Sequence, residues 1–237
     1  MYSFYSNNCN VVNLHGCLKK IATNFISLLD IFQVYYKRNN EMEKNMNIRN
    51  VCPIIIDAQN DFISGNLGTP EAKKATSRVA EVVKWFNENN ILAPIFTLDM
   101  HNQYDYKSTQ EGQKLQVDHC FIGNRGCLID EKIAKYAIPQ SYYLTKSTFG
   151  YPEWEKIINH LESMYDIDEF VMCGFCTDIC VIANFQLLKT LFPEKTITIL
   201  SDCCAGTTPE LHEAALKVME SCQAEIMTWD EFVKNMY

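Results

Sequence analysis

The sequence lacks a long hydrophobic run. Its most apolar N-terminal segment, residues 21–36, is interrupted by Asp30 and is too short and too polar to span a membrane. No small-residue cleavage signal follows a signal-peptide core. We expect an amphipathic helix there and a polar linker over 37–44. The sequence therefore predicts an N-terminal extension over 1–47, dispensable or the product of a start codon assigned too early, and a catalytic domain over 48–237.

An excess of positive charge is also missing. The chain has 21 Lys and Arg residues against 29 Asp and Glu residues, a net charge of −8. An acidic protein is not attracted to nucleic acid or to an anionic membrane surface, so both partners are excluded. We expect a small-molecule partner instead.

The sequence has no internal repeat, no low-complexity tract and no second C-x-x-C pair. Its 11 cysteines are odd in number and scattered, which fits reduced thiols and a cytoplasmic location better than a disulfide framework. A length of 237 residues with 47% apolar residues is enough for one well-buried α/β domain.

Short apolar runs alternate with helical patterns throughout this domain. Because parallel strands are joined by such crossover helices, the pattern predicts an α/β, Rossmann-like fold with a parallel sheet covered on both faces. The expected strands are Val51–Ile56, Ile91–Phe96, Tyr142–Thr145, Phe170–Cys173, Thr196–Leu200 and Glu225–Met227, and helices begin at Pro70, Pro152, Thr177, Pro209 and Thr228.

Polar side chains follow these predicted strands. In open parallel sheets, ligands bind outside the carboxyl ends of the strands, so residues far apart in sequence meet in one crevice. The side chains that the pattern brings there are Asp57, Asp99, His101, Lys146, Cys176, Cys180 and Asp202. An acid, a lysine and a cysteine are thus expected to share one pocket.

Cys180 is the candidate nucleophile. It follows an apolar run that stops at Gly174, in the first turn of a helix that Thr177 is expected to cap. Free backbone N–H groups at a helix start stabilise a thiolate, and Asp57 and Lys146 could supply a base and a cation. No histidine stands next to Cys180 in the sequence, so the carboxylate would transfer the proton.

Several ordered motifs together resemble the isochorismatase-like cysteine hydrolases, over roughly residues 50–228. They are Asp57-Ala58-Gln59-Asn60-Asp61-Phe62, Asp99-x-His101, His119-Cys120-x-x-Gly123, Lys146, Gly174-x-x-Thr177-Asp178-x-Cys180 and Asp202-Cys203-Cys204-Ala205-Gly206. The resemblance implies a three-layer α/β/α sandwich with a six-stranded, mainly parallel sheet, and a homo-oligomer as a possible assembly. It is nearest to the nicotinamidases of that family.

The resemblance also implies roles for individual residues. Asp57 would be the general base and acid, Lys146 would orient and support the pair, and Cys180 would be the nucleophile. The backbone N–H groups of Cys176 and Cys180 would form the oxyanion hole, and the family's cis peptide would fall between Phe175 and Cys176.

A metal site is implied in the same way. Asp99, His101 and His119 would bind one divalent ion, with Glu111 as a fourth candidate ligand directly or through water. Two imidazoles and a carboxylate suit Zn²⁺, the expected ion, or Fe²⁺ or Mn²⁺. In nicotinamidases the pyridine nitrogen takes an open position on the metal, and the product nicotinate enters NAD salvage.

The substrate pocket departs from the nicotinamidase pattern at one position, where Gln116 replaces an aromatic residue three before His119. Phe62 and either Phe149 or Tyr151 would still hold a ring. The alternatives are hydrolysis of a ureido, carbamoyl or small amide substrate by the same machinery, isochorismate hydrolysis, which needs neither the cysteine nor the histidines, and a non-catalytic interaction module.

Overall fold

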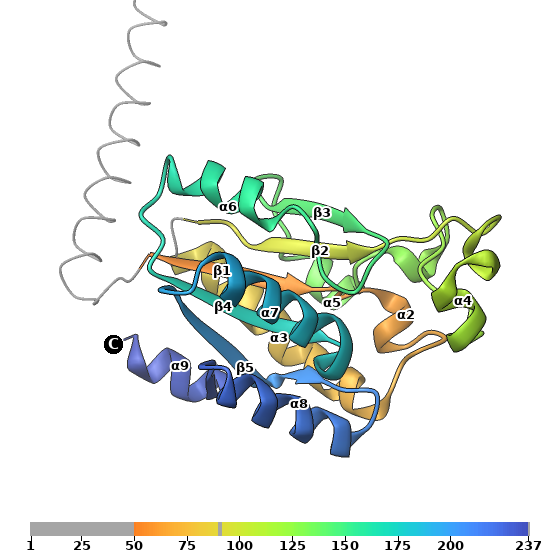
Figure 1. The fold of residues 1–237 in the computed structure, drawn as a ribbon. Coiled ribbons are helices and arrows are strands. Elements are labelled where there is room, and N and C mark those ends of the chain that lie inside the picture. Colours follow the sequence, from red (N-terminus) through yellow and green to blue (C-terminus); the bar gives the residue numbers. More distant parts are fainter. Residues whose placement is uncertain (1–49, 90–91, 237) are drawn as a thin grey trace, which may run out of the picture. The chain divides into compact units, whose positions relative to one another are not determined.

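The computed structural model describes residues 50–89 and 92–236 (Figure 1). The predicted extension over 1–47 lies outside these residues, so the division of the chain at that point stays a prediction. No helix in the described part of the chain is long and apolar enough to cross a membrane.

Six strands form one sheet in the order β3-β2-β1-β4-β5-β6, and every neighbouring pair is parallel. The strands are β1 (Val51–Ile56), β2 (Ile95–Asp99), β3 (Tyr142–Lys146), β4 (Glu169–Phe175), β5 (Thr196–Ala205) and β6 (Glu225–Met227). The predicted parallel α/β sheet is confirmed.

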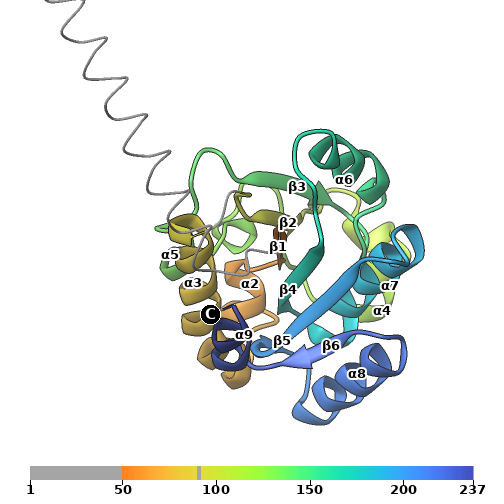
Figure 2. The ribbon, with the colours of Figure 1, turned by 90° about the vertical axis from the view of Figure 1, so that its left-hand side faces the viewer.

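Helices cover both faces of this sheet (Figure 2). The longer ones are α3 (Pro70–Asn89), α6 (Trp154–Glu162), α7 (Ile182–Leu191), α8 (Pro209–Ser221) and α9 (Trp229–Asn235), and the short ones are α2 (Asn60–Ile63), α4 (Gln110–Leu115) and α5 (Glu131–Ala134). Single helical turns lie at η1 (Tyr106–Ser108), η2 (Arg125–Cys127) and η3 (Thr177–Val181). Helices α3, α5 and α9 lie on one side of the sheet and α6, α7 and α8 on the other.

The helix starts follow local sequence signals. The Thr208 hydroxyl accepts from the backbone N–H of Leu211, with Pro209 in the first turn of α8. Thr228 and Glu231 form the expected capping box of α9. The buried face of α3 packs on α9: the ring centroids of Phe86 in α3 and Trp229 in α9 lie 6.3 Å apart.

Three local predictions were wrong. The second strand begins at Ile95, directly after Pro94, rather than at Ile91. The fifth strand continues to Ala205, so Asp202 lies inside it and not beyond its end. There Asp202 accepts from the backbone N–H of Trp229, which makes it a structural contact.

The third correction concerns Thr177. Cys176 is the N-cap of the turn, Thr177 to Val181 form one turn of π-helix, and no side chain caps it. The hydroxyl of Thr177 instead contacts Nδ1 of His212 at 2.8 Å. A cap needs a side chain that turns back along its own helix, and here α8 offers a tertiary partner.

Candidate active site and metal centre

The site lies where the strand order reverses. From β1 the chain builds outward to β2 and β3, and from β4 it builds the other way to β5 and β6. The crevice at such a switch point lies outside the carboxyl ends of β1 and β4. Asp57 follows β1, and Cys180 follows β4 in η3.

Gly174 lets these two strand ends approach. Its φ is +129°, and a Cβ built there would lie 2.0 Å from the backbone oxygen of Ile56. No other residue tolerates both the conformation and the contact. The stop at glycine in the sequence therefore marks a close approach of β4 to β1.

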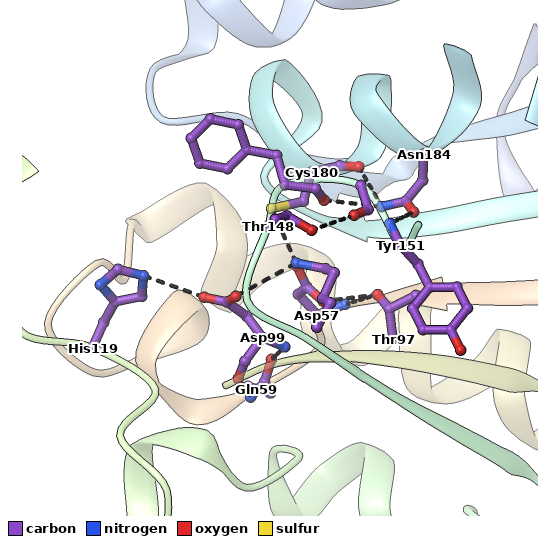
Figure 3. A network of polar contacts seen from close by, with 12 residues as sticks. Asp57, Gln59, Thr97, Asp99, His119, Thr148, Tyr151, Cys180 and Asn184 are labelled. Carbon is purple, nitrogen blue, oxygen red and sulfur yellow. Dashed lines mark hydrogen bonds and ion pairs between the residues drawn. The ribbon is translucent and has the colours of Figure 1, made fainter. Parts of the chain in front are cut away.

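Asp57, Lys146 and Cys180 meet in this crevice, and Figure 3 shows Asp57 and Cys180 there. Lys146 Nζ lies 2.6 Å from Asp57 Oδ2 and 3.6 Å from Cys180 Sγ. The three residues are almost completely buried, with exposed fractions of 0%, 5% and 4% for Asp57, Lys146 and Cys180. The structure thus brings together the three residues that the sequence placed in one pocket.

Asp57 is held in a defined orientation. Its Oδ1 accepts from the hydroxyl of Thr97 at 2.7 Å, and its backbone N–H donates to the Oγ1 atom of Thr97 at 3.2 Å. The φ of Asp57 is +46°, a left-handed conformation that few non-glycine residues adopt. Oδ1 is therefore engaged by Thr97, while Oδ2 faces Lys146.

Burial dominates the electrostatics of this group. Burial, together with the Asp57 carboxylate, raises the pKa of the Cys180 thiol well above its ordinary value, although the Lys146 ammonium opposes the shift. Burial also raises the pKa of Asp57. Burial lowers the pKa of Lys146, but the carboxylate of Asp57 and its other neighbours raise it by more. Burial thus opposes the thiolate stabilisation expected at a helix start, and transfer of the thiol proton to Asp57 stays a prediction.

Four predicted metal ligands lie beside this group. The candidate ligand atoms of Asp99, His101, Glu111 and His119 all lie within 4.8 Å of one another. Asp99 Oδ2 is 2.9 Å from His101 Nε2 and 3.3 Å from His119 Nε2, and Glu111 Oε1 is 3.4 Å from His119 Nε2. Ligand atoms about 2.1 Å from one zinc ion lie roughly 3.0–3.4 Å apart. The donor set and its spacing fit such an ion.

Neighbouring groups orient the ligands. Nδ1 of His119 lies 2.9 Å from the carbonyl oxygen of Val117, which fixes the proton on Nδ1 and leaves Nε2 to face the cluster. The buried Gln59 donates to the carbonyl of Asp99 and accepts from its N–H, both at 2.8 Å. Gln59 belongs to a motif that the sequence showed, but only the structure reveals that it positions Asp99.

The charges of the cluster favour a cation. Burial lowers the pKa of His119, but hydrogen bonds with Asp99 and Glu111 outweigh burial and raise it to about 10. Burial raises the pKa of Asp99, and hydrogen bonds with His101 and His119 bring it below its usual range. Two carboxylates that favour a proton on a neighbouring imidazole also favour a metal ion in place of that proton.

Cys180 and the four candidate metal ligands line one pocket of about 1050 Å³. Phe62 and Phe149 are in its wall as expected. Gln116 is not, because it ends α4 in a left-handed conformation with φ +55° and is exposed. Tyr151 is not either, since its ring packs edge-on against Trp154 at 5.4 Å. Two of the four candidate substrate-binding residues, Phe62 and Phe149, therefore line the pocket.

Comparison with known proteins identifies the family. Residues 51–231 match the family described as the isochorismatase domain, which is more than half of the chain. The chain belongs to the isochorismatase family. A nicotinamidase of Escherichia coli (strain K12) is 22% identical over 208 residues, covering 75% of this chain and 96% of its own length.

Solved structures show the same fold. The zinc complex of pyrazinamidase from Pyrococcus horikoshii has a TM-score of 0.64 at 23% identity, over 76% of this chain and 99% of that chain. N-carbamoylsarcosine amidase from Thermoplasma acidophilum has a TM-score of 0.61 at 21% identity, over 76% of this chain and 96% of that chain. These relatives act on different amides, so the likeness fixes the fold and not the substrate.

The turn after β4 agrees with the family pattern. The peptide bond between Phe175 and Cys176 is cis, as the resemblance implied. Cys176 and Cys180 both line the pocket. The N–H groups of Ile179 and Val181 bond to the carbonyl of Cys176 at 3.1 and 3.0 Å, so they are already used. An oxyanion hole made by the N–H groups of Cys176 and Cys180 stays a prediction.

Asn184 is a buried residue beside the nucleophile turn that the sequence reasoning missed. Its Nδ2 donates to the carbonyl of Cys180 at 2.7 Å and to that of Phe149 at 3.2 Å. Its Oδ1 accepts from the N–H of Tyr151 and from Nε1 of Trp154, both at 2.8 Å (Figure 3). An asparagine four residues after a nucleophile, and so on the same helix face, is the signal that could have found it.

Proposed function

We propose that this protein is a metal-dependent cysteine amidohydrolase that converts nicotinamide and water to nicotinate and ammonia. One observation carries the proposal. Asp99 Oδ1 lies 3.6 Å from Lys146 Nζ, which also contacts Cys180 Sγ, while Asp99 Oδ2 contacts His101 and His119. The nucleophile and the metal cluster therefore flank the same part of one pocket.

The acylation step follows from the geometry. Asp57 takes the thiol proton of Cys180, and Lys146 stabilises the negative charge while Sγ attacks the amide carbonyl carbon. The backbone N–H groups of Cys176 and Cys180 would stabilise the oxyanion. The C–N bond then breaks as Asp57 returns the proton to the leaving nitrogen, which leaves ammonia and a thioester on Cys180.

Deacylation uses the same carboxylate. Asp57 removes a proton from water, the hydroxide attacks the thioester carbonyl, and the C–S bond breaks to restore the thiol and release the acid. A divalent ion held by Asp99, His101, His119 and Glu111 would supply a Lewis acid that binds a ring nitrogen. Phe62 packs on the ring of His119 at 5.8 Å and offers an aromatic surface for the substrate ring.

Ammonia release from nicotinamide by the zinc-loaded protein tests the proposal. Cys180→Ala is expected to lower turnover by at least ~100-fold, because removal of the nucleophile blocks thioester formation. Cys222→Ala is the matched control, since Cys222 lies outside the pocket wall and is expected to leave turnover unchanged. Undiminished turnover in Cys180→Ala, with an unchanged circular dichroism spectrum, would refute the nucleophile assignment.

A carbamoyl or ureido amide is the second candidate substrate. The observation in its favour is the weak second ring wall, because Phe149 is 51% exposed and Gln116 and Tyr151 lie outside the pocket. Release of ammonia from a carbamoyl amino acid but not from nicotinamide, lost in Cys180→Ala, would establish this alternative with the same mechanism.

A further inference from the structure

The pocket has a buried inner part and an exposed outer part. Cys180 and His119 are 4% and 3% exposed, whereas Leu115, Ile122 and Phe149 in the same pocket are 41%, 65% and 51% exposed. The outer pocket is defined as Leu67, Leu115, Ile122 and Phe149, all apolar and all in the pocket wall. An apolar surface that opens outward from a reaction centre remains available to a ligand that reaches beyond it.

The backbone places this outer pocket next to the candidate metal ligands. The N–H of Ile122 donates to the carbonyl of His101 at 3.0 Å. Leu115 follows Glu111 by four residues in α4, so the two side chains share a helix face. Thr109 caps this helix by accepting from the N–H of Gly112. Leu115 and Ile122 therefore lie on backbone that is hydrogen-bonded next to candidate metal ligands, and both side chains are more exposed than those ligands.

The size of the pocket points the same way. A cavity of about 1050 Å³ lies at the upper end of the range for drug-sized ligands, about 300–1,000 Å³. One pyridine ring with a carboxamide fills only a part of it. Charged side chains also line the pocket, among them Glu111 and Lys114, whereas Asp118, between Leu115 and Ile122 in the sequence, is not part of the pocket wall.

We propose, resting on the proposed function, that the preferred substrate is an aromatic carboxamide with an apolar substituent that occupies the outer pocket. The carboxamide lies at Cys180, and the substituent covers Leu115 and Ile122. Removing this apolar surface from water favours the longer substrate by about fourfold for each methylene that is fully buried. Leu115 and Ile122 are thus specificity-determining residues.

The test compares kcat/KM for nicotinamide with kcat/KM for nicotinamides that carry methyl, propyl or pentyl on ring carbon 5. We expect kcat/KM to rise with chain length, by at least tenfold from nicotinamide to the propyl compound. Leu115→Ser and Ile122→Ser are expected to reduce the ratio of propyl to parent, and Leu211→Ser to preserve it. Leu211 is 48% exposed and is not part of the pocket wall, so it is a matched control.

Binding to Cys180→Ala separates this proposal from the proposed function. If no compound releases ammonia, titration calorimetry of the zinc-loaded variant with the same series still measures the outer pocket. The proposal is supported if affinity rises with the length of the substituent and falls when Leu115→Ser is added to Cys180→Ala. A flat series, or one that both serine variants leave unchanged, overturns it. A dimer that Leu115→Ser dissociates, together with a flat series, would show that a second copy covers the surface instead.

Discussion

Asn184 offers the sharpest test of how the nucleophile is held. It is fully buried at the start of α7 and links the nucleophile turn to the 149–154 segment by four hydrogen bonds. That segment carries Phe149, which lines the pocket. Removal of the amide therefore perturbs both Cys180 and the wall opposite to it.

Asn184→Ala removes two donors and two acceptors at once. A buried polar group without a partner costs about 1–3 kcal/mol, and water from the pocket can reach some of these groups, so we expect a loss of about 3–5 kcal/mol in the free energy of unfolding. For a domain of this size, that corresponds to a fall in Tm of roughly 6–15 °C. Displacement of the Cys180 backbone is expected to lower kcat/KM about tenfold, or roughly 1.4 kcal/mol of transition-state stabilisation.

Thermal unfolding and steady-state kinetics measure the two effects. Asn159→Ala is the control, because Asn159 is an exposed asparagine in the helix α6. It is expected to leave Tm within about 1–2 °C of the wild type, as surface substitutions usually do. If Asn184→Ala also left Tm and kcat/KM unchanged, the positioning role derived from its four hydrogen bonds would be refuted.

Three further outcomes are expected. Because burial raises the pKa of Asp57, the acid limb of kcat/KM should lie above the usual carboxyl value of about 4, and a limb at or below that value would contradict its role as base. Asp99→Asn should lower the bound zinc measured by metal analysis after dialysis, whereas an equal zinc content would show that Asp99 is not a ligand. Burial lowers the pKa of His212 below its ordinary value, so the unfolded chain binds more protons near pH 6 and the free energy of unfolding rises with pH there. In urea titrations at pH 5.5 and 7.5, the free energy of unfolding of His212→Gln should differ less between the two pH values than that of the wild type. An equal difference would exclude His212 as the source of this pH dependence.

Local sequence features determined the architecture. Apolar runs of strand length, proline and threonine at helix starts and glycine at the end of β4 depend on neighbours along the chain, so they could be identified without a structure. The carboxyl-end rule then gathered Asp57, Lys146 and Cys180 at one edge of the sheet, where the structure places them in contact. The resemblance added the metal ligands, whose atoms the structure brings within 4.8 Å.

Contacts between distant elements needed the tertiary structure. Burial of Cys180 raises the pKa of its thiol, an effect opposite to the one expected from the helix start alone. Packing against Trp154 removes Tyr151 from the pocket, and the left-handed end of α4 removes Gln116. Asn184 acts on residues up to 35 positions away. A sequence sets the spacing of residues along the chain, whereas desolvation and hydrogen bonding depend on which elements pack together, and only the folded structure decides that.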